Sequence, residues 1–459
     1  MFRNIFNTFA NCFKIPELKS RILFTIGVLA VVRLTAHVVI PGLNGAALAQ
    51  YFDTHMQGFG GLLGMYNTFA GGAYENCAIG ALGIMPYITA QIILQLMTAV
   101  VPQLSKLARE EGGRVKIIQY SRYLTVLLCL CQGAYFARGW LNPTRQFPGF
   151  EGQLVLIQSH VLYLITTVLI MTTGTMLLMW LGEQISERGV GNGVSLVITI
   201  GIVARLPNAW QGVEDMFFHQ GSQFNAGHGV VLVLLLLGVI AGVIAVTQAQ
   251  RKIPVQYAQR AVGRKLYSGG TSFMPLRVNY SGVMPIIFAQ SILMFPGQIF
   301  AWLATSPKVI YFHNQFQWLA MHFGYGSGLY MLSYALMILF FSYFWVATQF
   351  NEIQIADDLK KTGGYIPGVR PGQQTSDYLH RAMSRITLAG GIFLTLIAII
   401  PIFLYRQMNV DQNVANFFGG TSILITVGVL LDTMRQVESH LLMRHYDGFL
   451  KKGRLRGRF

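Results

Sequence analysis

A short, glycine-dense apolar segment, residues 60–72, runs directly into a full-length apolar run, residues 77–100. The short segment cannot cross a hydrocarbon core of about 30 Å, which requires about 20 apolar residues. It is also too apolar for a solvated loop, and irregular backbone at membrane depth is tolerated only where protein buries it or where it lines a cavity. The pattern predicts a half-helix that enters a cavity from the outer face without crossing the membrane, as a stopper does.

The composition supports a membrane protein. Hydrophobic residues make up 53% of the 459 residues and charged residues only 11%, whereas soluble domains carry about 25% charged residues. The 49 glycines favour closely packed membrane helices, whose contacts are rich in small residues. The chain is expected to be an all-α, multi-pass membrane protein. Residues 1–21 are expected to be an amphipathic cytoplasmic segment rather than a cleavable signal, because no short apolar region with a small-residue cleavage site is present.

Ten apolar runs, separated by polar or Gly/Pro-marked connections, predict ten transmembrane helices. They are residues 22–40, 77–101, 120–137, 161–181, 194–206, 230–247, 282–305, 328–350, 386–404 and 421–431.

The basic residues orient these spans, because Lys and Arg accumulate in cytoplasmic segments. With the amino terminus inside, most of the 34 Lys and Arg residues fall in the inner segments, and both termini are cytoplasmic. The short apolar segment then lies at the outer face. Six basic residues fall elsewhere: Arg33, Arg138, Arg145, Arg205, Lys308 and Arg406.

Two inner loops, residues 248–280 and 351–378, are longer than helix connections require. The second contains IPGVRPGQQ, in which two prolines fix φ and two glycines permit tight turns, so that Arg370 lies at the apex of a stiffened tip. Positive-inside bias explains the charge but not the stiffening. We therefore expect a docking surface for an anionic protein or for RNA phosphates. Anionic lipid also accounts for residues 451–458 of the basic tail, which is residues 438–459.

No sequence pattern indicates enzymatic chemistry. The chain has no Gly-Lys dipeptide and hence no Walker A lysine, and its four cysteines show neither metal-ligand nor disulfide spacing. ERGVGNGVS is expected to be a turn at a helix start, since no strand precedes it. Within the spans the charged residues are Arg33, Arg122 and Arg205, and Asp432 directly follows the last run, so the runs themselves contain no carboxylate. Because ion-coupled pumps need intramembrane carboxylates or histidines, an uncharged pathway without cofactor or metal is expected.

Branched apolar residues at helical spacing suggest a constriction. If a helix starts near Asn76, Ile84 and Ile88 lie about 12 and 18 Å into a core of about 30 Å, on one face. Val194 and Ile198 repeat the spacing in the fifth span. Taken alone these are ordinary core residues, but a ring of such side chains can also gate a pore by excluding water.

Five long blocks resemble the signature of the SecY family, the central subunits of the bacterial protein-conducting channel. They are GGA…ALGIMPYITAQIILQLM, MWLGEQISERGVGNGVSL, PLRVNYSGVMPIIFAQSI, ADDLKKTGGYIPGVRPGQQT and FGGTSILI, and the similarity extends from about residue 15 to the basic tail.

The resemblance implies a fold and a function. The fold would be two inverted five-helix halves, residues 22–222 and 223–437, forming a clamshell around an hourglass pore. A re-entrant plug, residues 58–73, would block it. The channel would translocate unfolded secretory polypeptides and release transmembrane segments laterally into lipid, driven by an external motor.

The resemblance also assigns residues by their place in the blocks. The pore ring would be Ile84, Ile88, Val194, Ile198, Ile287 and Ile425. The plug would contribute Leu62, Leu63, Met65, Tyr66 and Phe69. The lateral gate would contain Gln95 and Asn279, and docking would involve Arg264, Lys265 and Arg370.

The implied partners are the small subunits SecE and SecG, the SecA motor, the ribosome, signal sequences with nascent polypeptides, and membrane lipids, but not DNA. The implied location is the bacterial inner membrane.

Two positions depart from the family pattern: acidic Glu75 follows the plug, where a neutral or basic residue is expected, and Val194 is smaller than the usual isoleucine. Rival hypotheses are an inverted-repeat secondary transporter, which needs a polar midplane site, an intramembrane enzyme, and a structural scaffold. The transporter and the enzyme need polar or catalytic residues that the spans do not supply, and a scaffold needs neither a stopper nor stiffened tips.

Overall fold

The computed structural model describes most of the chain. The described residues are 15–54, 62–110, 112–143, 147, 149–150, 152–218, 226–257, 260–262, 265–267, 270–305, 312–324, 326–408, 410, 414–415 and 421–452.

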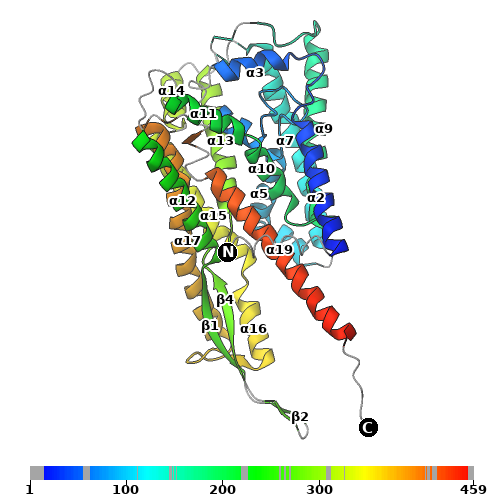
Figure 1. Cartoon of the computed structure of the whole chain (residues 1–459), viewed down its shortest axis with the longest axis vertical. Helices are drawn as coiled ribbons and strands as arrows, with labels where there is room; N and C mark the ends of the chain where they lie inside the picture. Colours follow the sequence, from blue (N-terminus) through cyan, green and yellow to red (C-terminus); the bar gives the residue numbers. More distant parts are fainter. Residues whose placement is uncertain are drawn as a thin grey trace. The chain divides into compact units, whose positions relative to one another are not determined.

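Helices dominate the described residues (Figure 1). They are α2 (Pro16–Thr35), α3 (Gly45–Thr54), α4 (Leu62–Phe69), α5 (Met85–Val100), α6 (Pro102–Arg109), α7 (Gly113–Leu141), α9 (His160–Arg188), α10 (Gly193–Val203), α11 (Leu206–Phe218), α12 (Ala226–Gln248), α13 (Met284–Thr305), α14 (His313–His322), α15 (Gly328–Gln349), α16 (Glu352–Thr362), α17 (Gln373–Met408) and α19 (Thr421–Lys452).

Each of the ten apolar runs overlaps at least one of these helices, as the sequence predicted. Six described helical stretches are long and apolar enough to cross a membrane, seven if the bent pair α5 and α6 counts as one span. α2 is not among these stretches, and it carries Glu17, Lys19, Arg21 and Arg33.

The second span begins later than the sequence predicted. A helix was expected from residue 77, but α5 begins at Met85 and residues 70–84 form successive turns. The cause is that the backbone of this stretch bonds to another segment: Cys77 O accepts from Ile40 N at 2.9 Å, and Ile79 N donates to Val38 O at 2.9 Å. Because these groups are already paired, they cannot form i→i−4 helical bonds.

The same difference corrects the depth expected for the constriction residues. Ile84 is the N-cap of α5 and Ile88 lies in its first turn, so neither is 12 or 18 Å inside a helix. Their one-turn spacing remains, since Ile88 N donates to Ile84 O at 3.2 Å.

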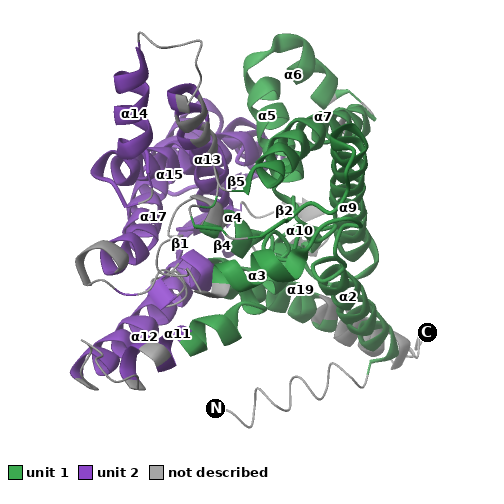
Figure 2. Ribbon diagram, turned by 90° about the horizontal axis from the view of Figure 1, so that it is seen from above, with its two compact units in different colours: residues 1–211, 425–459 green, residues 212–424 purple. Residues whose placement is uncertain are grey.

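Two compact units divide the chain (Figure 2). Unit 1 comprises residues 1–211 and 425–459, and unit 2 comprises residues 212–424. In unit 1, α9 packs against α2, α7 and α10, while α7 also packs against α5 and α10 against α4. Most of α19 belongs to unit 1, where Val437 and Leu441 pack on Leu18 and Val190.

The glycine-rich turn between α9 and α10 is structural, as expected. Gly191 adopts φ 91°, a conformation that favours glycine, and its N–H donates to the Gln436 side chain of α19 at 2.9 Å. Asn192 caps α10 by accepting from Ser195 N at 3.2 Å.

Unit 2 combines helices with a small sheet. α15 packs against α13 and α17, and α16 against α17. β1 (Gln250–Tyr257) lies between β4 (Thr271–Arg277) and β5 (Gly364–Tyr365), antiparallel to both. A smaller ribbon pairs β2 (Arg260–Val262) with β3 (Lys265–Tyr267). In Figure 1 the β1–β4 hairpin and α16 lie side by side at one end of the helices of this unit.

Candidate functional site

The half-helix predicted from the sequence is α4. It has eight residues, about 12 Å at 1.5 Å per residue, too short to span a bilayer. Tyr66, a residue of α4, is buried. Its hydroxyl donates to Leu82 O at 2.8 Å, and its ring lies 5.0 Å from that of Phe136 and 5.9 Å from that of Tyr74. Apolar packing therefore holds one side of α4. We call residues 62–84 the half-helix segment.

Two glycines bring this segment against α10. Gly71 has φ 65°, and a Cβ there would lie 2.8 Å from the Cα of Gly201 and 2.6 Å from Nη1 of Arg33. A Cβ on Gly201 would lie 3.3 Å from the carbonyl oxygen of Phe69. Any larger residue at Gly71 would push the turn away from α10.

A polar cluster fixes the carboxyl end of α4. Asn67 is 1% exposed. Its Nδ2 donates to Oε2 of Glu75 at 2.6 Å, and its Oδ1 accepts from Glu75 N at 3.2 Å. Oε2 of Glu75 also accepts from Nη2 of Arg205, which lies between α10 and α11, in an ion pair whose side chains are 17% and 12% exposed. We call these three residues the clasp.

Arg33 of α2 approaches the same turn from another direction. Its Nη1 donates to the carbonyl oxygen of Gly71 at 2.9 Å. The guanidinium also interacts electrostatically with both Arg205 and Glu75. The Glu75 carboxylate is therefore ion-paired with Arg205 and also attracts the guanidinium of Arg33 electrostatically.

The six candidate pore-ring residues are described, and five of them are buried. Ile84, Ile88, Ile198, Ile287 and Ile425 are each at most 3% exposed, and Val194 is half-buried. Val194 and Ile198 lie one turn apart in α10, Ile287 lies in α13 and Ile425 in α19.

The other candidates on the spans are described in part. Leu62, Leu63 and Met65 lie in α4, but their side chains are outside the described residues, whereas Phe69 is half-buried. Gln95 is half-buried in α5, and Asn279 is 8% exposed and accepts from the Ser281 hydroxyl at 3.4 Å.

The two long loops, residues 248–280 and 351–378, contribute strands to one sheet in unit 2. β5 comes from the second loop and pairs with β1 of the first, through Gln256 with Tyr365 and Tyr257 with Gly364. From the sequence alone, no pairing between the two loops was predicted. We call β1, β4, β5, α16 and the first turns of α17 the sheet module.

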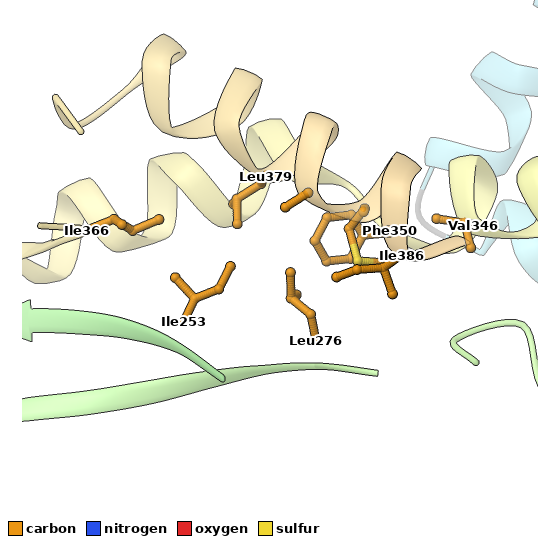
Figure 3. Close-up of a cluster of buried hydrophobic side chains, with 9 residues drawn as sticks. Ile253, Leu276, Val346, Phe350, Ile366, Leu379 and Ile386 are labelled. Carbon is orange, nitrogen blue, oxygen red and sulfur yellow. The ribbon is translucent and has the colours of Figure 1, made fainter. Parts of the chain in front are cut away.

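A hydrophobic cluster stabilises the sheet module (Figure 3). Ile253 of β1 and Leu276 of β4 point from the strands toward Leu379 and Ile386 of α17, and Phe350 and Ile366 flank them. Leu379 is 0% and Ile253 1% exposed. Burying such side chains contributes about 1.5–3 kcal/mol each, which explains how a protruding structure keeps its shape.

Arg370 lies on a rigid turn of this module, as the sequence predicted. Gly368 and Gly372 have φ 82° and 101°, and the Thr375 hydroxyl donates to Arg370 O at 2.9 Å. The Arg370 side chain is exposed. Lys265 lies in β3, but its side chain is outside the described residues. Arg264 lies outside the described residues altogether.

Metal chemistry receives no support from the geometry. Among the described residues no group of three or more His, Cys, Asp or Glu side chains could hold a metal ion.

Sequence reasoning missed the clasp. It identified Glu75 only as a departure from the family pattern, and Arg33 and Arg205 only as basic residues outside the inner segments. Those two anomalies were the available signal, because an acidic residue and two unassigned arginines near the same membrane face are candidates for pairing.

Comparisons with known proteins agree over nearly the whole chain. A model of the SecY family matches residues 78–434. The protein translocase subunit SecY of Chlamydia muridarum is 42% identical over 461 residues, covering 98% of this chain and 99% of the relative. The protein translocase subunit SecY of Vibrio cholerae is 44% identical over 453 residues, covering 96% of each.

Solved structures show the same fold, each covering 92% of both chains at 17% identity. A protein-conducting channel gives a TM-score of 0.56. A SecY channel whose plug domain stabilises the closed state and maintains a membrane seal gives 0.55. Sec61 in the canine ribosome–channel complex from the endoplasmic reticulum gives 0.52.

Proposed function

The chain belongs to the SecY family of protein translocase subunits, and from this premise we propose how its own residues conduct a polypeptide. The segment 58–73, of which residues 62–73 are described, is the plug of the channel. It closes the pathway at rest and moves when a translocating chain enters.

The observation that carries this proposal is the short helix α4 with its turn, residues 70–84. The segment is largely buried although α4 is too short to span a bilayer. Tyr66 packs on aromatic rings within unit 1, and glycines bring the turn against α10. A segment held by a few defined contacts, rather than by membrane-spanning length, can leave its site without unfolding the helices around it.

We assign the seal around the moving chain to Ile84, Ile88, Val194, Ile198, Ile287 and Ile425. Branched apolar side chains exclude water and ions without binding a polypeptide. The small Val194 makes this seal slightly looser at one position.

Gln95 and Asn279 are assigned to the lateral gate, through which transmembrane segments reach lipid. A signal sequence with about ten apolar residues gains roughly 5 kcal/mol on partitioning. Switching a two-state gate from mostly closed to mostly open requires about 5.5 kcal/mol. The two magnitudes are comparable, so the signal sequence itself can drive opening.

Directional transport then needs an external partner, and the sheet module is its docking site in this proposal. Arg370 and the β2–β3 ribbon with Arg264 and Lys265 meet the SecA motor or the ribosome on the cytoplasmic side. A related channel structure contains a ribosome. SecE and SecG complete the complex in the bacterial inner membrane, with both termini cytoplasmic, and the chain itself performs no enzymatic step.

The test is single-channel conductance of the purified protein with its small subunits in a planar bilayer, with and without deletion of Leu62–Phe69. A silent wild type and a leaky deletion variant support the plug. As a control, the deletion variant must remain monodisperse and retain its helical circular dichroism.

Equal silence of both proteins, with folding intact, contradicts the plug assignment. That result would favour a secondary transporter, which does not need a stopper.

A further inference from the structure

The residue that departs from the family pattern, Glu75, lies at the centre of the polar contacts on α4. We propose that the clasp of Asn67, Glu75 and Arg205 sets how readily the half-helix segment is released, and thereby how strictly the channel discriminates between signal sequences. This inference rests on the proposed plug function and assigns its specificity to three residues.

Asn67 forms two hydrogen bonds with Glu75. Its amide donates to the carboxylate at 2.6 Å and its oxygen accepts the Glu75 backbone N–H at 3.2 Å. In addition, Gly72 N donates to the backbone oxygen of Asn67 at 2.9 Å. The end of α4 is therefore tied to the turn that follows it in one orientation.

Arg205 then connects this turn to a different element. Its ion pair with Glu75 joins residues 130 positions apart, and Arg205 N donates to Ile202 O of α10 at 3.1 Å. Because α10 also carries Val194 and Ile198, the clasp links the half-helix segment to the helix that supplies two assigned pore-ring residues.

The charge balance makes Glu75 decisive. Arg33 is repelled by Arg205 and attracted, to a smaller extent, by Glu75, while the Glu75 carboxylate is ion-paired with Arg205. Removing the charge of Glu75 leaves like charges facing each other in a partly shielded site, where repulsion is stronger than in bulk water. The turn that Arg33 and Arg205 now hold would then be pushed open.

The contacts are also suited to release rather than to permanent locking. The ion-paired side chains retain 17% and 12% exposure, so water can solvate both charges as the segment leaves. A pair with access to water contributes less than a fully buried one. The clasp therefore supplies a threshold that a strong signal sequence can exceed and a weak one cannot.

The test compares Glu75→Gln with Glu183→Gln. The control residue also belongs to unit 1 and pairs with Arg122 of α7 at 2.7 Å, but it lies in α9, outside the half-helix segment. Glu75→Gln should raise the frequency of channel opening about tenfold, equivalent to about 1.4 kcal/mol. Glu183→Gln should leave it unchanged.

Selectivity provides a second readout that a merely structural role would not move. Translocation into vesicles is measured for one substrate carrying either an intact or a weakened signal sequence. Glu75→Gln should reduce the ratio of their rates several-fold while retaining transport of the intact substrate.

Arg205→Gln should also raise the opening frequency, because it removes the same ion pair, but by less than Glu75→Gln, because it leaves no like charges facing each other. The double variant should open no more often than Glu75→Gln alone. Arg205→Lys keeps the charge and should give an intermediate effect. This variant keeps the test decisive if Glu75→Gln fails to fold.

The Leu62–Phe69 deletion separates the two levels of the proposal. If the deletion leaks but Glu75→Gln and Arg205→Gln behave as Glu183→Gln does, the clasp is wrong and the plug remains. If the Leu62–Phe69 deletion variant shows no conductance, the plug assignment itself is wrong, and the clasp proposal that rests on it is wrong as well. Additive effects in the double variant would also overturn the clasp.

Discussion

The half-helix segment of unit 1 and the sheet module of unit 2 are both irregular insertions between long helices, yet they are stabilised differently. The first is held by Tyr66, by close glycine contacts and by the charged clasp. The second is held by a continuous apolar cluster that includes Ile253, Leu276 and Leu379. Polar groups with access to water can exchange protein partners for solvent, whereas apolar groups cannot leave a core without a large cost. The contrast agrees with the roles that we propose, a segment that moves and a surface that keeps its shape.

The largest effect is expected in the sheet module. Leu379→Ala should lower the free energy of unfolding by about 2–5 kcal/mol, because it leaves a cavity in a core. Leu396→Ala, in the same helix but at a side chain that is 61% exposed, is the matched control. Urea-dependent proteolysis in detergent measures both, and equal midpoints for the two variants would contradict a core that holds the module.

A smaller effect is expected where the half-helix segment meets α5. Replacing both Ile84 and Ile88 with Asn should destabilise the closed state by about 2 kcal/mol, since each amide costs about 1 kcal/mol to bury. Small-ion leakage in planar bilayers should rise, or signal-sequence selectivity should fall. The control replaces both with Val, which keeps the site apolar. Unchanged conductance and selectivity in the Asn variant would refute the pore-ring assignment.

Gly71→Ala tests the close approach to α10. The left-handed backbone costs roughly 1–2 kcal/mol for a residue with a Cβ, and the Cβ would also meet Arg33 and Gly201. Gly112→Ala is the matched control: its φ is 79°, and no described heavy atom lies within 4 Å of the added Cβ. Both variants place an alanine in a left-handed backbone conformation and are destabilised by it, but we expect more frequent channel opening only for Gly71→Ala. The same opening frequency in both would mean that the contact with α10 does not hold the segment.

The smallest change in stability is expected at the tip of the sheet module. Arg370→Ala should alter the free energy of unfolding by less than about 0.5 kcal/mol, as exposed substitutions usually do. The Arg370→Ala variant should nevertheless bind the SecA motor or the ribosome more weakly than the wild type does. Binding of the wild type should weaken as the salt concentration rises. Gln374→Ala, on the same exposed stretch without a charge, is the control. If Arg370→Ala binds these partners as tightly as Gln374→Ala does, Arg370 is not part of the docking site.

Much of the fold could be predicted from the sequence because its signals are local. Apolar runs of sufficient length predicted ten helices, and each run overlaps a helix in the structure. The prolines and glycines around Arg370 predicted tight turns in a stiffened tip, and the positive φ values of Gly368 and Gly372 confirm the turns. The start of the second span was wrong, because residues 77–80 are apolar but bond to the chain that follows α2.

By itself the sequence determined the number of helical runs, the short half-helix, the stiffened tip and the family. Each follows from residues close together in the chain, through hydrophobic length, backbone freedom or an uninterrupted motif. Only the tertiary structure decided that Glu75 pairs with Arg205 and that two distant loops share one sheet. A pairing across 130 residues leaves no periodic trace in the sequence, since the folded helices, and not the spacing of the residues, bring the two charges together.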